Sequence, residues 1–205
     1  MTNAIQQAIE SRMSVNHFEP NRPLSDDVIN ALIAQAARAP SAYNMQNWRF
    51  LAVRSEQSKS RLQSVAYGQQ KVVDASVSFI VCGVLAAHKQ LAEALQPSVD
   101  ASIMTQRMVD GWVAQASSAH EGNPVVQRDE AIRSASLAAM TLMLAAHGMG
   151  LGSCAMVGFD AARLSEAFNL GPAELPALRV TVGYPLAGSW PQKPRRPVPQ
   201  ILEIL

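Results

Sequence analysis

The chain has 205 residues, which is enough for one domain with a substantial core. Seventeen Lys and Arg against sixteen Asp and Glu give a formal net charge of +1, so charge gives no reason to expect binding to nucleic acid or to an anionic membrane. The N-terminus lacks a basic segment followed by an apolar one, so we expect no secretory signal and a cytoplasmic location. The longest apolar run, residues 135–146, is shorter than the roughly 20 residues of a membrane span and is interpreted as a buried helix.

The cysteines and histidines give no sign of a metal or disulfide framework. Cys82 and Cys154 both lie in apolar surroundings, so we expect buried, reduced thiols. The four histidines are scattered, and the chain contains no CxxC, which argues against a metal site.

The first part of the chain is predicted to alternate helices with one strand. Residues 3–12 have the pattern of a short amphipathic helix. Ser25 is a good N-cap for a helix that runs to residue 37 and has two acidic residues in its first turn. A strand is predicted at residues 50–53 and a surface helix at 56–65.

The connection between the second helix and the first strand is longer than the usual two to six residues. Pro40 ends the helix, because proline fixes φ and disfavours helix at the residue before it. Ser41, Asn44 and Gln46 then supply a hydroxyl and two carboxamides, which suit the polar edge of a planar heteroaromatic ligand. The alternative is a capped helix end followed by a polar turn.

The middle of the chain predicts a central strand and a long buried helix. A polar loop at residues 67–71 leads to a near-continuous apolar strand at 77–83, as expected in a sheet covered on both faces. Residues 86–119 are mostly helical in pattern, and their moderate polarity suggests an excursion that covers a pocket or a partner subunit. After a break at 122–124, residues 131–147 are apolar on almost every face, which predicts a helix buried all round.

The last part of the chain is predicted to end in an extended arm. Residues 153–160 are interpreted as a loop, 161–169 as a helix capped by Asp160, and 177–184 as the last strand. Residues 185–199 are rich in proline and should be extended, and the apolar residues 201–205 should dock in cis or on a partner. We therefore expect one domain over 1–205, with an excursion or lid at 86–122 and an arm at 185–205.

Several segments together resemble the FMN-dependent nitroreductase family, and the resemblance spans nearly the whole chain. The matching segments, in chain order, are residues 12–18 (RMSVNHF), 39–48 (APSAYNMQNW), 148–152, the loop through Gly158 and Asp160, 182–185 and 193–197 (KPRRP). Residues 128–133 and 156–160 are most similar to the small NAD(P)H nitroreductase and quinone reductase branch.

The resemblance implies an α+β fold, a three-layer α/β/α sandwich around a mostly antiparallel sheet. It also implies an intertwined homodimer with two FMN sites at the interface and an exchanged C-terminal arm. The residues it assigns to the phosphate and ribityl chain are Arg12, Ser14, Lys193 and Arg195. Those it assigns to the polar edge of the ring system are Asn16 and Lys71.

Further residues complete the cofactor site that the resemblance implies. Pro40, Ser41 and Asn44 would come from the other subunit. Met156, Val157 and Gly158 would line the flavin face or offer backbone amides to its reactive edge. Met13, Gln46 and Gln69 are also assigned to cofactor binding.

Three positions depart from the family pattern. Met13 stands where many relatives have a second arginine, so less positive charge faces the phosphate. Asn16 replaces a usual Lys or Arg, which would make bound flavin less oxidising. Asn47 replaces the proline before Trp48, so this turn should differ.

The activity implied is ping-pong hydride transfer, in which NAD(P)H reduces FMN and a nitroaromatic or quinone is then reduced on the same face. No nucleophile, metal or single catalytic acid is expected, because the cofactor carries the chemistry. One alternative keeps FMN but changes the reaction to dehalogenation, flavin fragmentation or enoyl-type reduction. Others are a non-catalytic flavin-binding sensor or carrier, and a helical adaptor without ligand.

Overall fold

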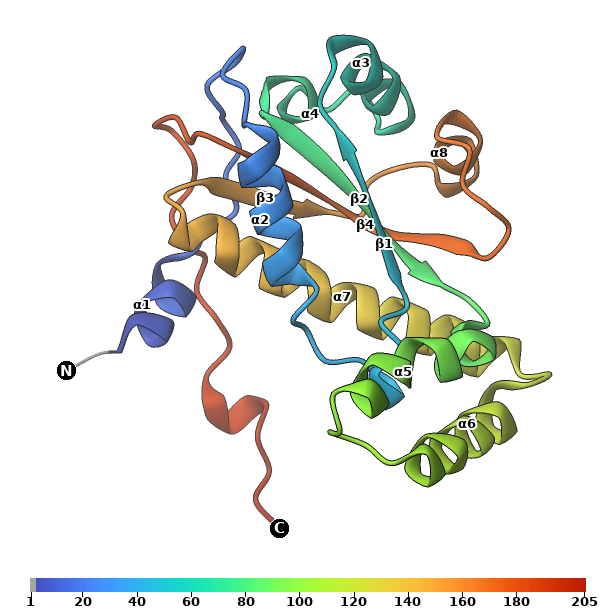
Figure 1. Ribbon diagram of the computed structural model, residues 1–205. Helices are drawn as coiled ribbons and strands as arrows, with labels where there is room; N and C mark the ends of the chain where they lie inside the picture. The colour runs from blue at the N-terminus through green and yellow to red at the C-terminus, as the bar shows by residue number, and fades with distance from the viewer. Residues whose placement is uncertain (1–2) are drawn as a thin grey trace.

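The fold is built on a four-stranded antiparallel sheet (Figure 1). The computed structural model describes residues 3–205, so residues 1 and 2 of the predicted domain lie outside it. The strands are β1 (Trp48–Val53), β2 (Val77–Val84), β3 (Gly152–Met156) and β4 (Glu174–Gly183), in the order β1-β2-β4-β3. Pro176 lies where the β2–β4 register shifts, a position that tolerates a residue without an amide hydrogen.

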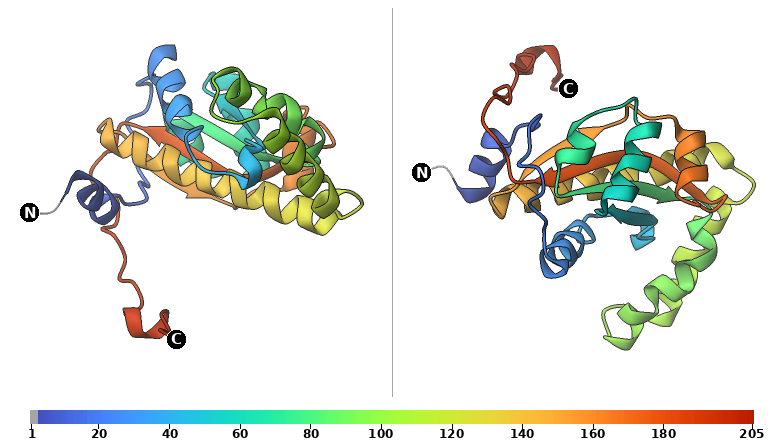
Figure 2. Two further views of the ribbon diagram at one scale, coloured as in Figure 1. Left: turned by 60° about the horizontal axis from the view of Figure 1, so that its bottom comes forward. Right: turned by 90° about the horizontal axis from the view of Figure 1, so that it is seen from above.

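Helices cover both faces of this sheet, as the alternation of side chains in β2 requires (Figure 2). Val77, Phe79 and Val81 pack with α2 (Asp26–Ala36) and α7 (Pro124–Gly148) in the main core. Ile80 and Cys82 face the other way, against α3 (Glu56–Val65) and α8 (Ala161–Ala167). The predicted α+β fold with three layers is confirmed.

The predicted excursion forms a small helical unit beside the sheet. It contains η2 (Ala87–Gln90), α5 (Leu91–Asp100) and α6 (Gln106–His120). A separate core cluster, including Leu91, Leu95 and Val109, joins these helices to Met45. The excursion therefore packs on the polar connection before β1, which forms the short helix η1 (Ala42–Asn44).

Three sequence predictions in the second half of the chain are wrong. Residues 153–160 are not all loop, because Gly152–Met156 pairs with β4 as an edge strand. Helix α7 begins at Pro124, seven residues before the predicted start, because Asn123 caps it by accepting from the Val126 amide and proline is tolerated in a first turn. The helix is also not buried all round, since Ser136 and Leu137 are exposed.

Helix α1 (Ala4–Ser11) and the C-terminal arm lie on the same side of the molecule (Figure 1). Helix α1 meets the C-terminal end of α7, where Ser11 Oγ lies 2.8 Å from His147 Nε2. Over residues 185–205, the C-terminal arm has neither a strand nor a long helix, and two short turns interrupt it, at residues 187–188 and in η3 (Val198–Gln200). Its last apolar residues, 201–205, are all exposed.

A short helix, α4 (Lys71–Asp74), precedes β2, so Lys71 begins a helix rather than ending a loop. None of the helices within residues 3–205 is both long enough and apolar enough to cross a membrane. In the same residues, no cluster of three or more His, Cys, Asp or Glu side chains has the geometry to hold a metal ion.

Candidate functional site

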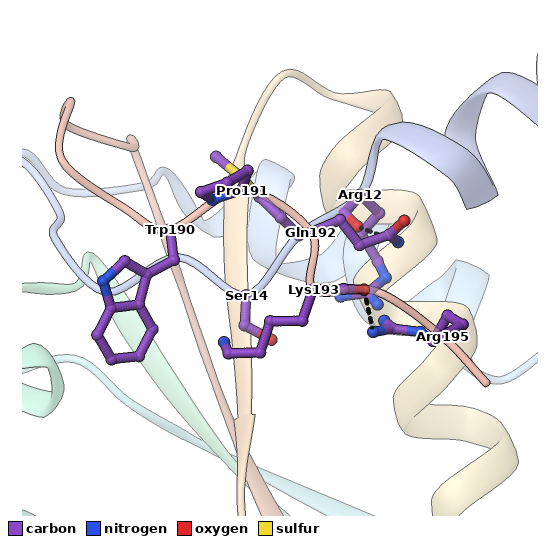
Figure 3. Close-up of a pocket in the computed structure, with 8 residues that line it drawn as sticks. Arg12, Ser14, Trp190, Pro191, Gln192, Lys193 and Arg195 are labelled. Atoms are coloured by element: carbon purple, nitrogen blue, oxygen red, sulfur yellow. Dashed lines mark hydrogen bonds between the residues drawn. The ribbon is translucent and has the colours of Figure 1, made fainter.

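A pocket of about 160 Å³ joins the start of the chain to its C-terminal arm (Figure 3). Its lining residues are Arg12, Met13, Ser14, Trp190, Pro191, Gln192, Lys193 and Arg195. Four of them are the residues assigned to a phosphate and ribityl chain from the sequence. The structure therefore brings together two segments that are about 180 positions apart along the chain, as the Gln192–Arg12 bond illustrates.

Hydrogen bonds to backbone carbonyls hold this pocket in place. The Val15 amide donates to the Ser153 carbonyl at 2.9 Å, which fixes the Arg12–Ser14 segment against β3. Gln192 Nε2 donates to the Arg12 carbonyl at 3.0 Å, which ties the arm to the same segment. Arg195 Nη1 donates to the Lys193 carbonyl at 2.8 Å, and this bond orients its guanidinium (Figure 3).

The charge in the pocket is positive and uncompensated. Within residues 3–205, no carboxylate forms an ion pair with Arg12, Lys193 or Arg195. Arg12 Nε is buried and has no hydrogen-bond partner among those residues. Guanidinium and ammonium groups beside a serine hydroxyl are the donors that bind a phosphate. The pocket is therefore built for an anion.

A second polar group lies next to β3. Lys71 Nζ donates to Asn16 Oδ1 at 2.8 Å and lies 3.7 Å from Cys154 Sγ. The backbone N–H of Asn16 in turn donates to Ser189 Oγ at 3.0 Å, so Asn16 is linked to the C-terminal arm. The two residues predicted at the polar edge of a ring system are thus in direct contact with each other.

The third part of the site is the turn that follows β3. The Gly158 carbonyl accepts from Gln69 Nε2 and from Arg179 Nη2, each at 3.1 Å. The Phe159 amide donates to the Val157 carbonyl at 3.0 Å. The amides of Val157 and Gly158 have no acceptor within the described part of the chain, and the Val157 residue is 75% exposed. Two adjacent N–H groups are therefore available to a ligand.

Arg179 was missed in the sequence predictions. It lies in β4 opposite Ile80 and Met156, is fully buried, and contacts the predicted turn through its guanidinium. The sequence offers one signal for Arg179, a charged residue within the apolar pattern of residues 177–182. That pattern by itself predicts only a strand.

The loop before β1 has a strained backbone. Tyr43, Asn44 and Gln46 all have positive φ, at 52°, 55° and 48°, and only asparagine adopts this region readily. Ser41 Oγ accepts from the Gln46 amide at 2.9 Å and closes the turn. Such strain often marks a functional segment. Pro40, Asn44 and Gln46 are exposed, so the loop presents its polar groups outward.

Within one chain, this loop and the cationic pocket lie at different places along α7. Next to the loop, Val84 donates to Asn47, and the adjacent Gly83 packs against Ala131 of α7. Next to the pocket, Ser11 contacts His147, which lies sixteen positions further along the helix and so about 24 Å away at 1.5 Å per residue. Ser41 and Asn44 are therefore not brought to the pocket that contains Arg12.

A separate pocket of about 480 Å³ lies between the loop and the excursion. It is lined by Met45, Gln46, Asn47, Trp48, Val84, Ala87, Gln90, Glu93 and Ala94. Gln46 therefore lines this pocket and not the one that contains Arg12. Tyr43 also packs edge-on against Trp112 of α6, with ring centroids 6.0 Å apart.

Comparison with known proteins places the chain in a family. The model of the Nitroreductase family matches residues 9–184, so the chain belongs to the nitroreductase family. YodC of Bacillus subtilis is 31% identical over 183 residues, covering 89% of this chain and 90% of YodC. YodC is assigned as an NAD(P)H nitroreductase by inference. DrgA of Synechocystis is 34% identical over 167 residues, covering 82% of this chain and 77% of DrgA.

Solved structures give the same result. The Bacillus subtilis protein ydfN, assigned as a nitroreductase by inference, has a TM-score of 0.92 and 30% identity, with 98% of each chain covered. A nitroreductase from Exiguobacterium sibiricum, solved in complex with FMN, has a TM-score of 0.91 and 26% identity, covering 99% of this chain and 98% of that one. The resemblance inferred from the sequence is thereby confirmed.

The residues present fit FMN. The cationic pocket suits a phosphate, the Lys71–Asn16 pair offers polar groups to a pyrimidine edge, and the Val157 and Gly158 amides are free to donate. Gly158 also suits this place, because a Cβ there would lie 3.0 Å from Gln69 Nε2 and would crowd that side chain. A planar ring can approach closely where there is no side chain.

Proposed function

We propose that this member of the NAD(P)H-dependent flavin oxidoreductases binds FMN and reduces nitroaromatics or quinones by ping-pong hydride transfer. The observation that carries the proposal is the uncompensated cationic pocket of Arg12, Lys193 and Arg195. An anion pocket formed by the N-terminal segment and the arm is what a flavin mononucleotide needs, because its phosphate is its only strongly charged group.

Each part of the chain has a separate task in this proposal. Bound FMN would supply the hydride chemistry, which the side chains alone cannot provide. Arg12, Ser14, Lys193 and Arg195 hold the phosphate and ribityl chain. Lys71 and Asn16 would orient the pyrimidine edge, and the Val157 and Gly158 amides would donate to the reactive edge. NAD(P)H would bind, deliver a hydride and leave, and the acceptor would then occupy the same face.

The proposal includes a homodimer. Pro40, Ser41 and Asn44 are assigned to the same cofactor as Arg12, yet none of them lines the pocket that contains Arg12 in one chain. The α7 residues next to their loop and next to that pocket, Ala131 and His147, are about 24 Å apart along the helix. A second chain would supply the three loop residues. The exposed apolar residues Ile201, Leu202 and Ile204 and the exposed Leu137 of α7 give each chain surface that a partner would cover. We propose that the C-terminal arm packs on the partner and completes its site.

A visible absorption spectrum tests the proposal. Purified protein should be yellow, should bleach with NADPH or NADH under anaerobic conditions, and should recover when a quinone or a nitroaromatic is added. Protein that stays colourless after incubation with FMN would show that the proposed cofactor is wrong. Yellow protein that no nicotinamide bleaches would favour a sensor or carrier.

The same assay addresses the acceptor. The excursion at 86–122 borders the 480 Å³ pocket and is proposed as the substrate lid. One relative, 24% identical over 187 residues, is named as an enone reductase of Lactiplantibacillus plantarum. An enone should therefore be included beside a quinone and a nitroaromatic, and the fastest reoxidation identifies the acceptor class.

A further inference from the structure

Arg179 is the largest fully buried side chain in the described part of the chain. It forms no ion pair with any described carboxylate, and its Nε and Nη1 atoms are buried without hydrogen-bond partners. Burial lowers the pKa of its guanidinium to about 10, so the group is still charged at neutral pH. A buried cation without a partner costs stability, so its presence needs a reason.

The polar contacts of the guanidinium lie at the end of β3 and in the turn that follows it. Its Nη2 donates to the Gly158 carbonyl at 3.1 Å and lies 3.9 Å from Met156 Sδ. The ring of Phe159 lies 5.7 Å from its central carbon, within reach of a cation–π interaction. Arg179 therefore contacts three of the four residues from Met156 to Phe159.

These contacts fix one peptide group at both ends. The carbonyl of the Gly158–Phe159 peptide accepts from Gln69 and Arg179, and its N–H donates to the Val157 carbonyl. With this peptide held, the two preceding N–H groups, of Val157 and Gly158, have a defined direction. A glycine would otherwise allow many conformations here.

We propose that Arg179 is a positioning residue that, together with Gln69, holds the Gly158 carbonyl and so aims the Val157 and Gly158 amides at the reactive edge of the cofactor. This inference rests on the proposed FMN function. Gln69 is likewise a positioning residue and not a ligand of the cofactor, because its side-chain amide donates to the Gly158 carbonyl. The fixed positive charge of Arg179 behind the turn would also stabilise the more electron-rich, reduced form of the flavin ring.

The test compares three site variants with one matched control. Arg179→Met removes the charge and the hydrogen bond to the Gly158 carbonyl, Arg179→Lys keeps the charge, and Gln69→Met removes only the other donor to that carbonyl. The control is Lys59→Met, because Lys59 is also a buried cation that donates to one backbone carbonyl, that of Val73 at 3.1 Å. The readouts are the ratio of reduced to oxidised FMN at a fixed dye potential, the Kd of FMN, and the urea stability of the apoprotein.

We expect the ratio of reduced to oxidised FMN to fall about tenfold, or about 1.4 kcal/mol, in Arg179→Met, because the variant loses the positive charge behind the turn and one of the two donors that hold the Gly158 carbonyl. Gln69→Met should shift it in the same direction by less, and Arg179→Lys should recover part of the loss. The Kd of FMN should change less than this ratio, since the phosphate pocket is intact. Lys59→Met should change apoprotein stability but leave the ratio at its wild-type value.

Each outcome separates the inference from the proposed function. Wild-type protein that binds no FMN overturns the proposed function. If Arg179→Met and Gln69→Met bind FMN and keep the wild-type ratio of reduced to oxidised FMN, the positioning role of Arg179 is wrong while the proposed function stands. The same conclusion follows if Lys59→Met shifts this ratio as much as Arg179→Met does. If Arg179→Met does not fold, Gln69→Met provides the test of the positioning role. Gln69 is only half-buried, so its substitution should leave the protein folded.

Discussion

Lys71 Nζ donates to Asn16 Oδ1 at 2.8 Å, and this bond joins the N-terminal segment to the helix that enters the central strand of the sheet. Each residue alone is an ordinary polar side chain. Together they form a fixed pair beside Cys154 on β3, and one ammonium hydrogen is left for another acceptor once Asn16 Oδ1 and Cys154 Sγ are counted. A carbonyl oxygen of a ligand is the acceptor that this arrangement would suit.

Replacing Lys71 with methionine should weaken FMN binding about tenfold, because one hydrogen bond from a charged donor is lost and Asn16 loses its partner. The measurement is FMN fluorescence quenching on titration of the apoprotein. Lys89→Met is the matched control, since Lys89 is an exposed lysine of the excursion paired with Glu121 at 3.4 Å. Equal affinities for Lys71→Met and wild type would remove Lys71 from the site.

The double variant Ser14→Ala/Arg195→Gln should raise the Kd of FMN about tenfold to a hundredfold, since it removes a hydroxyl and a guanidinium from the phosphate pocket. The wild-type Kd should also rise with added salt, and the variant should lose part of this dependence. Arg128→Gln serves as the control, because Arg128 is an exposed arginine near the start of α7. Unchanged FMN affinity in the double variant would contradict the phosphate assignment.

Removing residues 201–205 should weaken self-association and FMN binding together. The tail exposes Ile201, Leu202, Ile204 and Leu205, and burying such apolar side chains contributes roughly 25 cal/mol per Å². Sedimentation velocity at micromolar concentration should show a dimer for the full chain and a larger monomer fraction after truncation. A full-length monomer that binds FMN would refute the shared site.

Much of the fold could be predicted because its signals are local. Helix α3 spans Glu56–Val65, as its pattern predicted, and the buried strand β2 extends the prediction by only one residue. The sequence does not predict β3, because β3 is stabilised by pairing with residues of β4 that lie more than twenty positions further along the chain. The glycine, serine and other small residues of β3 have only a weak preference for strands. The phosphate pocket was assigned through family motifs, whereas Arg179 was missed because nothing local shows that its guanidinium turns toward Gly158.

The thiol of Cys82 provides a pH-dependent prediction. Burial raises its pKa from 9.0 to about 12, so between these values the native state keeps a proton that the unfolded state releases. The free energy of unfolding should therefore fall as pH rises through this range, by at most about 1.4 kcal/mol per pH unit for this one group. Urea denaturation at pH 8, 9 and 10 measures the slope.

Cys82→Ala should be less stable at pH 8 because of the smaller side chain, but its stability should fall less steeply above pH 9. Cys154→Ala is the comparison, since Cys154 is the only other cysteine. An identical slope in Cys82→Ala and wild type would show that Cys82 does not contribute to the alkaline loss of stability.

Gly83 and Gly111 should respond in opposite directions to the same substitution. A Cβ on Gly83 would lie 2.3 Å from the Ala131 carbonyl oxygen of α7, so the helix backbone would have to move away from β2. We expect Gly83→Ala to destabilise the protein by about 1–3 kcal/mol, as overpacking does. A Cβ on Gly111 would meet nothing within 4 Å, and this residue lies inside α6, so Gly111→Ala should stabilise the protein by up to about 1 kcal/mol. Urea midpoints measure both, and a Gly83→Ala variant as stable as wild type would contradict the close approach of α7 to the sheet.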